Sequence, residues 1–398
     1  MKSVLLTDAF APEIGGIQTY LRKVCECLGP SVHVICFGIR PPAMREEQNG
    51  TDSFRVERIR RFSRPPGNPF IVSFDLARLF LIAVSTSIKE QVELIQCSGV
   101  SPIGIVGWLT SFVTRRPYIV YVYGMDLLTL IRNRIWKAIA VHVLSRAELV
   151  VTISQYMKRN IVRLGITEQN IFVLHPFIDT EFFRPLASTA ERRKLIGVRN
   201  KSVLLTVARL VRRKRVDTVI RLLPAILSEF PDVVYVVVGD GPEREPLIHL
   251  SATLNLVDKV RFLNGNGTPE IYNACDVFIM VSSDARNVGE VEGFGIVFIE
   301  ASACGKVVIG SRKEGIPDAI LHNRTGLLVD PDSPDEILGS IKRLLSNHSL
   351  MTELGKNGRE WVVRDFGMRM GCSNLEVMLE SLSKRAARQK SRMYPTWP

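Results

Sequence analysis

No apolar run in this sequence reaches the roughly 20 residues that a membrane-spanning helix needs. The two longest, LFLIAVSTSI from Leu79 and IGIVGWLTSFV from Ile103, are more typical of buried helices. The opening MKSVLLTDAF has one lysine and a short apolar run that ends at Asp8, so we expect no secretory signal. We therefore expect a cytoplasmic protein.

Cysteine is sparse and scattered. The seven cysteines form no C-x-x-C pair, and several lie in apolar runs where a thiol packs as a small hydrophobe. This pattern favours reduced thiols in a cytosol over a disulfide framework.

Several ligand signatures are also missing. VGDGPER, from Val238 to Arg244, lacks the G-x-G-x-x-G of a dinucleotide site, which disfavours an NAD enzyme. No aromatic-interleaved basic motif indicates nucleic acid. The acidic pair of Asp330 and Asp332 precedes a helical pattern and is typical of a loop and helix cap. We expect no cofactor and no essential metal.

Cations are plentiful, and the net charge is +12. They crowd between Arg55 and Arg64, between Arg209 and Arg215, and after Ser381, where the chain is expected to fray. For the first and last clusters two interpretations stay open, a solvated surface and docking to an anionic membrane.

The chain of 398 residues is too long for one ordinary core, and its two halves begin alike. SVLLTDAF from Ser3 and SVLLTVAR from Ser202 each precede a helical pattern and a second strand, the βαβ unit of a parallel sheet. The pattern predicts two doubly wound α/β domains, whose ligands bind at the carboxyl ends of the strands. Further strand candidates are LIQC, YIVYVY, LVVTIS, IFVLH, VRFLN, VFIMVS and VVIGS.

The segment VEGFGIVFIEASACGK carries the strongest chemical signal. Gly293 and Gly295 let backbone approach a ligand, and the following helix offers free N–H groups to a diphosphate. Eight helical residues would separate Glu292 and Glu300 by ~12 Å, whereas a retaining carboxylate pair needs ~5 Å. The two glutamates are therefore expected to grip different hydroxyl groups of one long ligand.

Two further segments are compatible with phosphate. Arg209 and Lys214 end a strand within a run of five cations, which predicts an anionic ligand or an exposed basic loop. Gly15 and Gly16 are expected at the start of the first helix, where their backbone could approach a phosphate. A plain turn is equally compatible with them.

Taken together, these stretches resemble the retaining glycosyltransferases of family 4, which have the GT-B fold. The resemblance covers most of the chain and is most specific at the E-x7-E segment. Within the family it is most like bacterial lipid-directed mannosyltransferases. The matching motifs are D-x-F-x-P-x-x-G-G-I-Q from Asp8, A-R-L with a following lysine from Ala208, VGDGPE, Y-x-x-C-D-V-F from Tyr272, the E-x7-E segment, EGIPDAI and TGLLVDP.

This resemblance implies two facing Rossmann-like domains with an interdomain cleft. Residues 1–185 would bind the acceptor and residues 200–365 the nucleotide-sugar donor, while residues 366–398 would form a helix returning to the first domain and a basic tail.

The resemblance also implies roles at matching positions. Arg209 and Lys214 would hold the donor diphosphate, Glu292 the hydroxyls of the transferred sugar, and Glu300 the ribose. Other donor contacts would come from Gly16 and from the backbone of Gly293, Phe294, Gly295 and Ile296. The acceptor side would hold Asp8, Gly15, Gln18 and Asp126.

Two departures from the family pattern stand out. The motif H-G-x-D/E reads Y-G-M-D here, so Tyr123 takes the catalytic position of a histidine, although a tyrosine pKa of ~10 makes a poor base. K-G-x-D reads K-R-V-D, with Arg215 in place of glycine. His175, at another strand end, is expected to face the cleft, while His142 is expected on a helix surface or in the core.

The predicted activity is transfer of a hexose, with retention, from a nucleoside-diphosphate sugar to a hydroxyl acceptor. By resemblance the donor is GDP-mannose ahead of UDP-sugars, and the acceptor is a lipid or polysaccharide precursor at the cytoplasmic membrane face. Two alternatives stay open: a scaffold that binds sugar nucleotide without catalysis, and another nucleotide-sugar enzyme on this fold.

Overall fold

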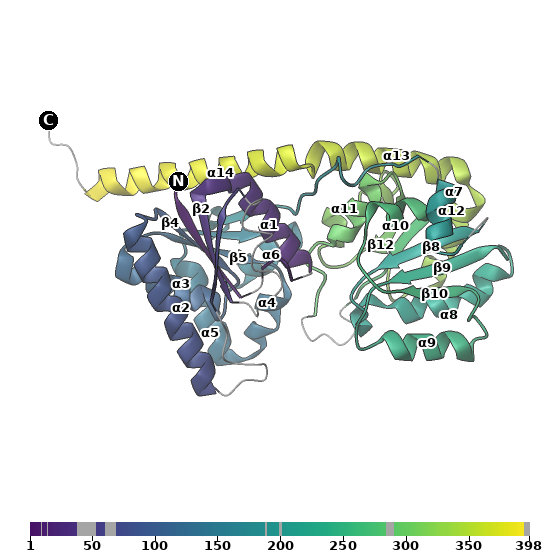
Figure 1. Cartoon of the computed structure of the whole chain (residues 1–398), viewed down its shortest axis with the longest axis horizontal. Helices are drawn as coiled ribbons and strands as arrows, with labels where there is room; N and C mark the ends of the chain where they lie inside the picture. Colours follow the sequence, from purple (N-terminus) through teal and green to yellow (C-terminus); the bar gives the residue numbers. More distant parts are fainter. Residues whose placement is uncertain are drawn as a thin grey trace. The chain divides into compact units, whose positions relative to one another are not determined.

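The computed structural model shows two compact α/β units (Figure 1). It describes residues 1–8, 10–13, 15–37, 53–59, 69–187, 189–198, 201–283 and 290–393. One unit comprises residues 1–175 and 369–398, and the other comprises residues 176–368.

The first unit is built on a seven-stranded parallel sheet with the strand order β3-β2-β1-β4-β5-β6-β7. Its strands β1, β4 and β5 are buried along their whole length, as is typical of parallel strands covered on both faces. The strands are β1 (Ser3–Thr7), β2 (Val32–Phe37), β3 (Arg55–Ile59), β4 (Leu94–Ser98), β5 (Tyr118–Val122), β6 (Leu149–Thr152) and β7 (Ile171–Val173).

All helices of this unit except the last lie between successive strands in the sequence. They are α1 (Gly16–Leu28), α2 (Pro69–Lys89), α3 (Ile103–Thr114), α4 (Met125–Leu128), α5 (Arg134–Arg146), α6 (Gln155–Arg163) and the last helix, α14 (Met368–Met393). The two longest apolar runs do form helices, α2 and α3, but the expectation that they are buried is wrong for part of each. Leu81 and Phe112, for example, are 64% and 67% exposed.

Helix α14 is attached to the first unit. The Arg385 guanidinium donates to the Glu148 carbonyl at 3.2 Å and to Asn170 Oδ1 at 3.0 Å. Cys372 forms a disulfide with Cys27 of α1, with a Cα–Cα distance of 5.3 Å. The expectation of reduced thiols is therefore wrong for this pair, because only the folded chain brings cysteines 345 residues apart together.

The second unit has a six-stranded parallel sheet with the order β10-β9-β8-β11-β12-β13. Its strands are β8 (Ser202–Val207), β9 (Val233–Val238), β10 (Val260–Leu263), β11 (Val277–Met280), β12 (Val307–Ser311) and β13 (Gly326–Val329). Its helices are α7 (Thr189–Leu195), α8 (Val216–Leu227), α9 (Arg244–Thr253), α10 (Pro269–Ala274), α11 (Ile296–Ala303), α12 (Pro334–Ser346) and α13 (His348–Asp365).

In each sheet the chain reverses its direction of winding at one strand. β1 lies between β2 and β4, and β8 lies between β9 and β11. The loops that follow β1 and β8 therefore leave the carboxyl edge at a switch point, where open α/β sheets bind ligands. This topology places Gly15 and Gly16 in the first unit, and Arg209 and Lys214 in the second, at such an edge.

The strand pattern missed two edge strands, β3 and β13. β3 lies inside the first basic cluster, whose residues 60–64 fall outside the described part of the chain. The stretch after Ser381 was expected to fray, but the α14 backbone stays helical as far as Met393.

Candidate active site

The loop after β8 is supported by the loop after β9. The Ala208 N–H donates to the Val238 carbonyl at 3.0 Å, and the Leu210 N–H donates to the Asp240 carbonyl at 2.8 Å. A Cβ on Gly239 would lie 1.9 Å from the Ala208 oxygen, and the φ of Gly239 is +138°. Glycine is required here because the two backbones touch. The VGDG motif thus serves as the support for the cationic loop.

Lys214 ends this loop in a short 3-10 turn, η5 (Arg212–Lys214), and is buried. Its ammonium forms an ion pair with the Glu292 carboxylate and lies 3.4 Å from Met280 Sδ. Burial lowers the pKa of Lys214, and the neighbouring Glu292 only partly offsets that effect.

Arg213 is a site residue that the sequence argument passed over. Its Nη1 lies 3.1 Å from Glu292 Oε2, the same oxygen that Lys214 binds. The signal was present in the run of five cations, but sequence alone did not show which of them turn inward. Burial would raise the pKa of Glu292, but Lys214 and Arg213 outweigh it and hold that pKa below its usual value.

The backbone around Glu292 is held by the loop after β12. The Glu292 N–H donates to the Glu314 carboxylate, and the Gly315 N–H donates to the Glu292 carbonyl at 3.0 Å. A Cβ on Gly315 would lie 1.9 Å from the Gly293 oxygen, so the two loops meet backbone to backbone. The EGIPDAI motif therefore positions the E-x7-E segment.

Helix α11 begins directly after Gly295, which adopts a left-handed conformation with φ of +88°. No side chain among the described residues caps this N-terminus, so the N–H groups of Ile296 and Val297 are available to an anion, while the Phe298 N–H donates to the Gly295 carbonyl at 3.0 Å. The Phe294 ring is buried, with its centre 5.6 Å from that of the Phe366 ring, so this side chain belongs to the packing of the second unit.

The helical spacing assumed for Glu292 and Glu300 is wrong. The helix starts only at Ile296, because Gly293 and the left-handed Gly295 belong to the preceding turn. The two carboxylates nevertheless have separate partners. Glu292 binds Lys214 and Arg213, as described above.

Glu300 accepts a hydrogen bond of 2.6 Å from the Tyr272 hydroxyl. Burial raises the pKa of Glu300 to about 7, and the Tyr272 hydrogen bond opposes that rise. Tyr272 is a second residue that the sequence argument left without a role, although it opens the recognised Y-x-x-C-D-V-F motif.

The remaining cations of the loop differ in exposure. Arg209 is exposed and has no ion pair with another described residue. Arg215, at the position of the family's glycine, keeps a left-handed conformation with φ of 52°. Its guanidinium lies 2.6 Å from Asp332 Oδ1, so this charge is directed to a carboxylate on the neighbouring loop.

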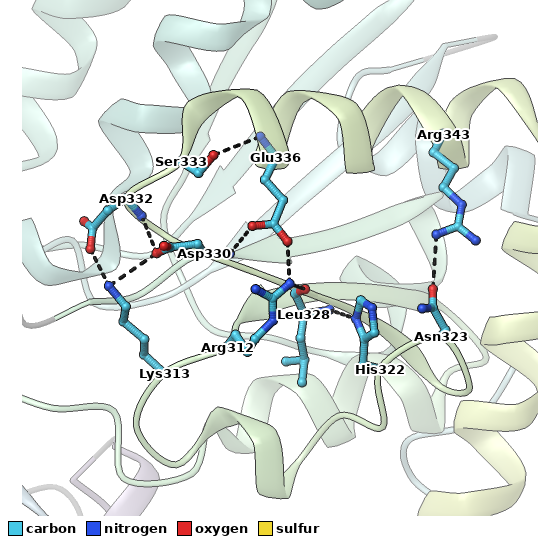
Figure 2. Close-up of polar contacts among 10 residues, drawn as sticks. All are labelled: Arg312, Lys313, His322, Asn323, Leu328, Asp330, Asp332, Ser333, Glu336 and Arg343. Atoms are coloured by element: carbon cyan, nitrogen blue, oxygen red, sulfur yellow. Dashed lines mark hydrogen bonds and ion pairs between the residues drawn. The ribbon is translucent and has the colours of Figure 1, made fainter.

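Asp330 and Asp332 belong to a surface network of ion pairs and to the approach to helix α12, as Figure 2 shows. Lys313 Nζ lies 3.3 Å from Asp330 and 2.5 Å from Asp332, while Ser333 caps the helix by accepting from the Glu336 N–H at 3.3 Å. The prediction of a loop and helix cap is confirmed. Within the described ranges, no group of three or more His, Cys, Asp or Glu side chains is arranged to hold a metal ion.

In the first unit, Tyr123 follows β5 and its side chain points into the interior. It is 7% exposed, and its ring lies edge-on to Tyr20 at 6.1 Å. Its hydroxyl is buried and makes no hydrogen bond of normal geometry to a described residue, although the nearby Ser98 hydroxyl opposes part of the rise in its pKa. Burial raises the pKa of Tyr123 well above its usual value, which makes the phenol a still poorer base.

Asp126 closes the turn that follows β5. Its Oδ1 accepts from the N–H groups of Tyr123 at 3.0 Å and Gly124 at 2.8 Å. Its Oδ2 is buried and has no hydrogen-bond partner in the described part of the chain. Burial raises the pKa of Asp126 to about 6, against the effect of the backbone N–H groups.

The other first-unit candidates lie around the loop after β1. Asp8 is exposed just beyond the strand, and Gly15 and Gly16 form the start of α1, which no side chain of the described residues caps. Gln18 lies in the first turn of this helix. This loop thus connects the exposed Asp8 to the start of α1.

Two histidines are accounted for separately. His175 Nδ1 lies 3.0 Å from the Ile153 carbonyl, directly after β7. His142 is exposed on α5, with its ring 4.8 Å from Trp108, as the interpretation of a helix-surface residue predicted.

Two parallel-sheet units with ligand-binding loops at their switch points are the architecture of the GT-B fold. Comparison with known proteins then shows the family. Residues 14–182 match the family described as Glycosyltransferase Family 4, and residues 188–361 match Glycosyl transferases group 1. The chain is a glycosyltransferase: its first part belongs to Glycosyltransferase Family 4 and its second part to Glycosyl transferases group 1. The family and the enzyme class predicted from the sequence are confirmed.

Relatives support the likeness to lipid-directed mannosyltransferases. A GDP-mannose-dependent alpha-(1-6)-phosphatidylinositol monomannoside mannosyltransferase of Mycobacterium tuberculosis is 29% identical over 375 residues, covering 90% of this chain and 93% of the relative. The enzyme of that name from Mycolicibacterium smegmatis is 27% identical, covering 97% and 100%. An N-acetyl-alpha-D-glucosaminyl L-malate synthase of Bacillus anthracis is 24% identical, covering 92% and 94%.

Solved structures share the fold. Anabaena HepE in complex with UDP and glucose has a TM-score of 0.80 at 22% identity, and the match covers 96% of this chain and 100% of HepE. Sucrose-phosphate synthase of Thermosynechococcus elongatus has a TM-score of 0.79 at 22% identity, covering 97% and 100%. The GT-B class with two Rossmann-like units is confirmed.

Proposed function

We propose that this glycosyltransferase transfers mannose from GDP-mannose to a hydroxyl of a lipid acceptor, with retention at the anomeric carbon. A nucleotide sugar is the donor class of the family. The finer identity of donor and acceptor is supported by the names of the relatives, which specify GDP-mannose and phosphatidylinositol monomannoside. Retention is proposed from family membership.

The observation that carries the proposal is the group formed by Glu292, Lys214 and Arg213. Both cations bind Oε2 of Glu292, and none of these contacts uses Oε1. In the proposed complex the cations, together with Arg209, also meet the donor diphosphate, while Oε1 accepts from hydroxyls of the transferred sugar. Preorganised positive charge of this kind favours departure of the diphosphate as its negative charge develops.

Backbone N–H groups add to this positive charge. In the proposed complex the N-terminus of α11, from Gly293 to Ile296, lies against the sugar and phosphate, and Gly16 at the start of α1 also contributes. Glu300, held by Tyr272, accepts hydrogen bonds from the ribose hydroxyls. We propose that these groups suffice without an essential metal ion.

The acceptor role is assigned to the first unit. Asp8, Gln18 and Asp126 supply polar groups near the loops after β1 and β5. Tyr123 contributes packing rather than proton transfer in this proposal, because its hydroxyl is buried against Tyr20.

Donor consumption tests the proposal. Purified protein is incubated with GDP-mannose, UDP-sugars or ADP-sugars, with and without phosphatidylinositol mannosides and with EDTA in parallel, while nucleoside diphosphate release is followed. We expect GDP release that the lipid stimulates and EDTA leaves unchanged. Release from a UDP-sugar instead would contradict the donor assignment, and tight nucleotide binding without turnover on any acceptor would favour the scaffold alternative.

A further inference from the structure

Asp332 connects two loops of the second unit. It lies between β13 and α12, and its two carboxylate oxygens bind different cations. Oδ1 lies 2.6 Å from the Arg215 guanidinium, and Oδ2 lies 2.5 Å from the Lys313 ammonium, the contact drawn in Figure 2. Arg215 belongs to the loop after β8 and Lys313 to the loop after β12. We call these three residues the Asp332 bridge.

Each contact of the bridge reaches the chain neighbour of a site residue. Arg215 directly follows Lys214, whose ammonium pairs with the Glu292 carboxylate. Lys313 directly precedes Glu314, whose carboxylate accepts from the Glu292 N–H. The bridge thus joins the two loops that meet at Glu292.

The backbone of both loops needs support from its surroundings. Arg215 and Glu314 are non-glycine residues in the left-handed region, with φ of 52° and 62°. Side chains other than glycine are strained in this region, and such strain persists only where neighbouring contacts hold it. The ion pairs of Asp332 are contacts of this kind, because one holds the Arg215 side chain and the other holds the residue before Glu314.

The neighbouring carboxylate does not replace Asp332. Asp330 also pairs with Lys313, at 3.3 Å, but within the described residues it forms no ion pair with Arg215. The hydrogen bond from Lys313 is the main reason why the pKa of Asp332 lies below its ordinary value, and the one from Arg215 acts in the same direction. Asp332 is therefore ionised at neutral pH and can bind both cations.

We infer that Asp332 is a positioning residue for donor binding. It holds the loops after β8 and β12 together and so keeps Lys214 and Glu292 in the arrangement that receives the donor. Both of its oxygens are occupied by cations, so it acts through them and not on the donor itself. The contact to Arg215 exists because this chain has arginine where the family pattern has glycine, which makes the complete bridge a feature of this sequence.

This inference rests on the donor roles proposed for Lys214 and Glu292, but the bridge can be measured without a donor. The Glu292 N–H donates to Glu314, and the Gly315 N–H donates to the Glu292 carbonyl at 3.0 Å. Both hydrogen bonds break when the two loops separate. Local opening of this kind is observed as faster hydrogen exchange of the amides concerned.

The first measurement is amide hydrogen exchange of the complete chain without donor, followed on peptides that contain Glu292 and Gly315. The test variant is Asp332→Asn, which keeps the size of the side chain and removes its charge. Glu229→Gln is the matched control, because Glu229 pairs with Lys342 on the same unit and its side chain is 56% exposed, against 50% for Asp332. Asp332→Glu tests for rescue, and thermal melting checks that each variant folds.

Exchange at the two amides should be about threefold faster or more in Asp332→Asn than in the wild type, and unchanged in Glu229→Gln. Asp332→Glu should restore most of the protection. Wild-type exchange in Asp332→Asn would overturn the inference, because the loops would then be held without the bridge.

Donor kinetics are the second measurement. With GDP-mannose, Asp332→Asn should raise the KM about threefold to fivefold, because fewer molecules have the loops in the competent arrangement. The kcat should stay within about twofold of the wild type, because saturating donor restores that arrangement. The difference in KM should narrow at high salt, which screens exposed ion pairs.

A double-mutant cycle with Arg215→Gly assigns these effects to the bridge. In that background, which already lacks one contact, Asp332→Asn should raise the KM by no more than about twofold. Independent effects of the two substitutions, or a fall in kcat at unchanged KM, would overturn the inference. Faster exchange in Asp332→Asn beside a wild type that releases no nucleoside diphosphate from any donor would instead contradict the proposed function and leave the bridge intact.

Discussion

Lys214 and Glu292 form a buried ion pair between two loops of the second unit, although 78 residues separate them in sequence. The side chains are 10% and 14% exposed. The cation assigned to the diphosphate and the carboxylate assigned to the sugar are thus positioned by each other before a donor binds. Burying two charges has a desolvation cost that can cancel the free energy gained from their attraction. The pair is therefore better explained as preorganisation of a site than as a contact that stabilises the fold.

Replacing Glu292 tests this arrangement. Glu292→Gln should lower kcat by about 100-fold or more, because the contact to the sugar weakens and the two cations lose their counter-charge. The fold should survive at a reduced melting temperature, since a buried cation loses its partner. Glu243→Gln is the control, because Glu243 pairs with Arg212 in the same region at 3.0 Å. Steady-state kinetics beside thermal melting measure both effects, and near-normal turnover of Glu292→Gln would refute the assignment.

Glu300 predicts a pH dependence of donor binding. Its pKa is about 7, and the ionised form is the better acceptor for two ribose hydroxyls. Raising the pH through that pKa therefore increases the competent fraction, so the KM for the donor should fall several-fold between about pH 6 and about pH 8. Kinetics across this range measure the effect.

Two variants assign that profile to Glu300. Glu300→Gln should flatten the low-pH limb. Tyr272→Phe should shift it to higher pH, because the lost hydrogen bond no longer lowers the carboxyl pKa. If the low-pH part of the KM profile is unchanged in both variants, another group is responsible for the titration. Asp126 would then be the next residue to replace.

Tyr123 is expected to tolerate replacement. Tyr123→Phe removes a buried hydroxyl that makes no hydrogen bond of normal geometry and has Ser98 beside it, so stability should change by less than about 1 kcal/mol. Tyr123→His should leave activity unchanged or raise it. Tyr20→Phe is the matched control and should destabilise by about 1 kcal/mol, since the Tyr20 hydroxyl donates to the Leu174 carbonyl at 3.1 Å. A large loss of kcat in Tyr123→Phe would show that the phenol takes part in the reaction.

Arg215 is expected to be replaceable by the family's glycine. Arg215→Gly relieves the backbone strain of a non-glycine residue in the left-handed conformation, which stabilises the fold. It also removes a partly exposed ion pair with Asp332, which destabilises it by a similarly small amount. Stability should therefore change by less than about 1 kcal/mol, and the KM for the donor by no more than a few-fold. Arg215→Val should destabilise by about 1–2 kcal/mol, because a β-branched residue resists this conformation. A donor KM raised by an order of magnitude in Arg215→Gly would show that Arg215 binds the diphosphate.

The sequence was sufficient for the alternation of strands and helices and for the family. Buried parallel strands such as VVYVVV are continuous apolar runs, and glycines at close backbone approaches leave a local signature. The edge strands β3 and β13 were missed because β3 is polar and lies in a basic cluster, and β13 is short. Because such glycines leave a local signature, the EGIPDAI loop could be recognised by its motif before its contacts were known.

What only the tertiary structure decided were relations between residues far apart in the chain. It joined Cys27 to Cys372, selected Arg213 and Lys214 from a run of cations as the partners of Glu292, and buried Tyr123 against Tyr20. It also left parts of α2 and α3 exposed, where composition predicted burial. Local propensity and periodicity depend on neighbouring residues, whereas these contacts depend on how sheets and loops pack in space.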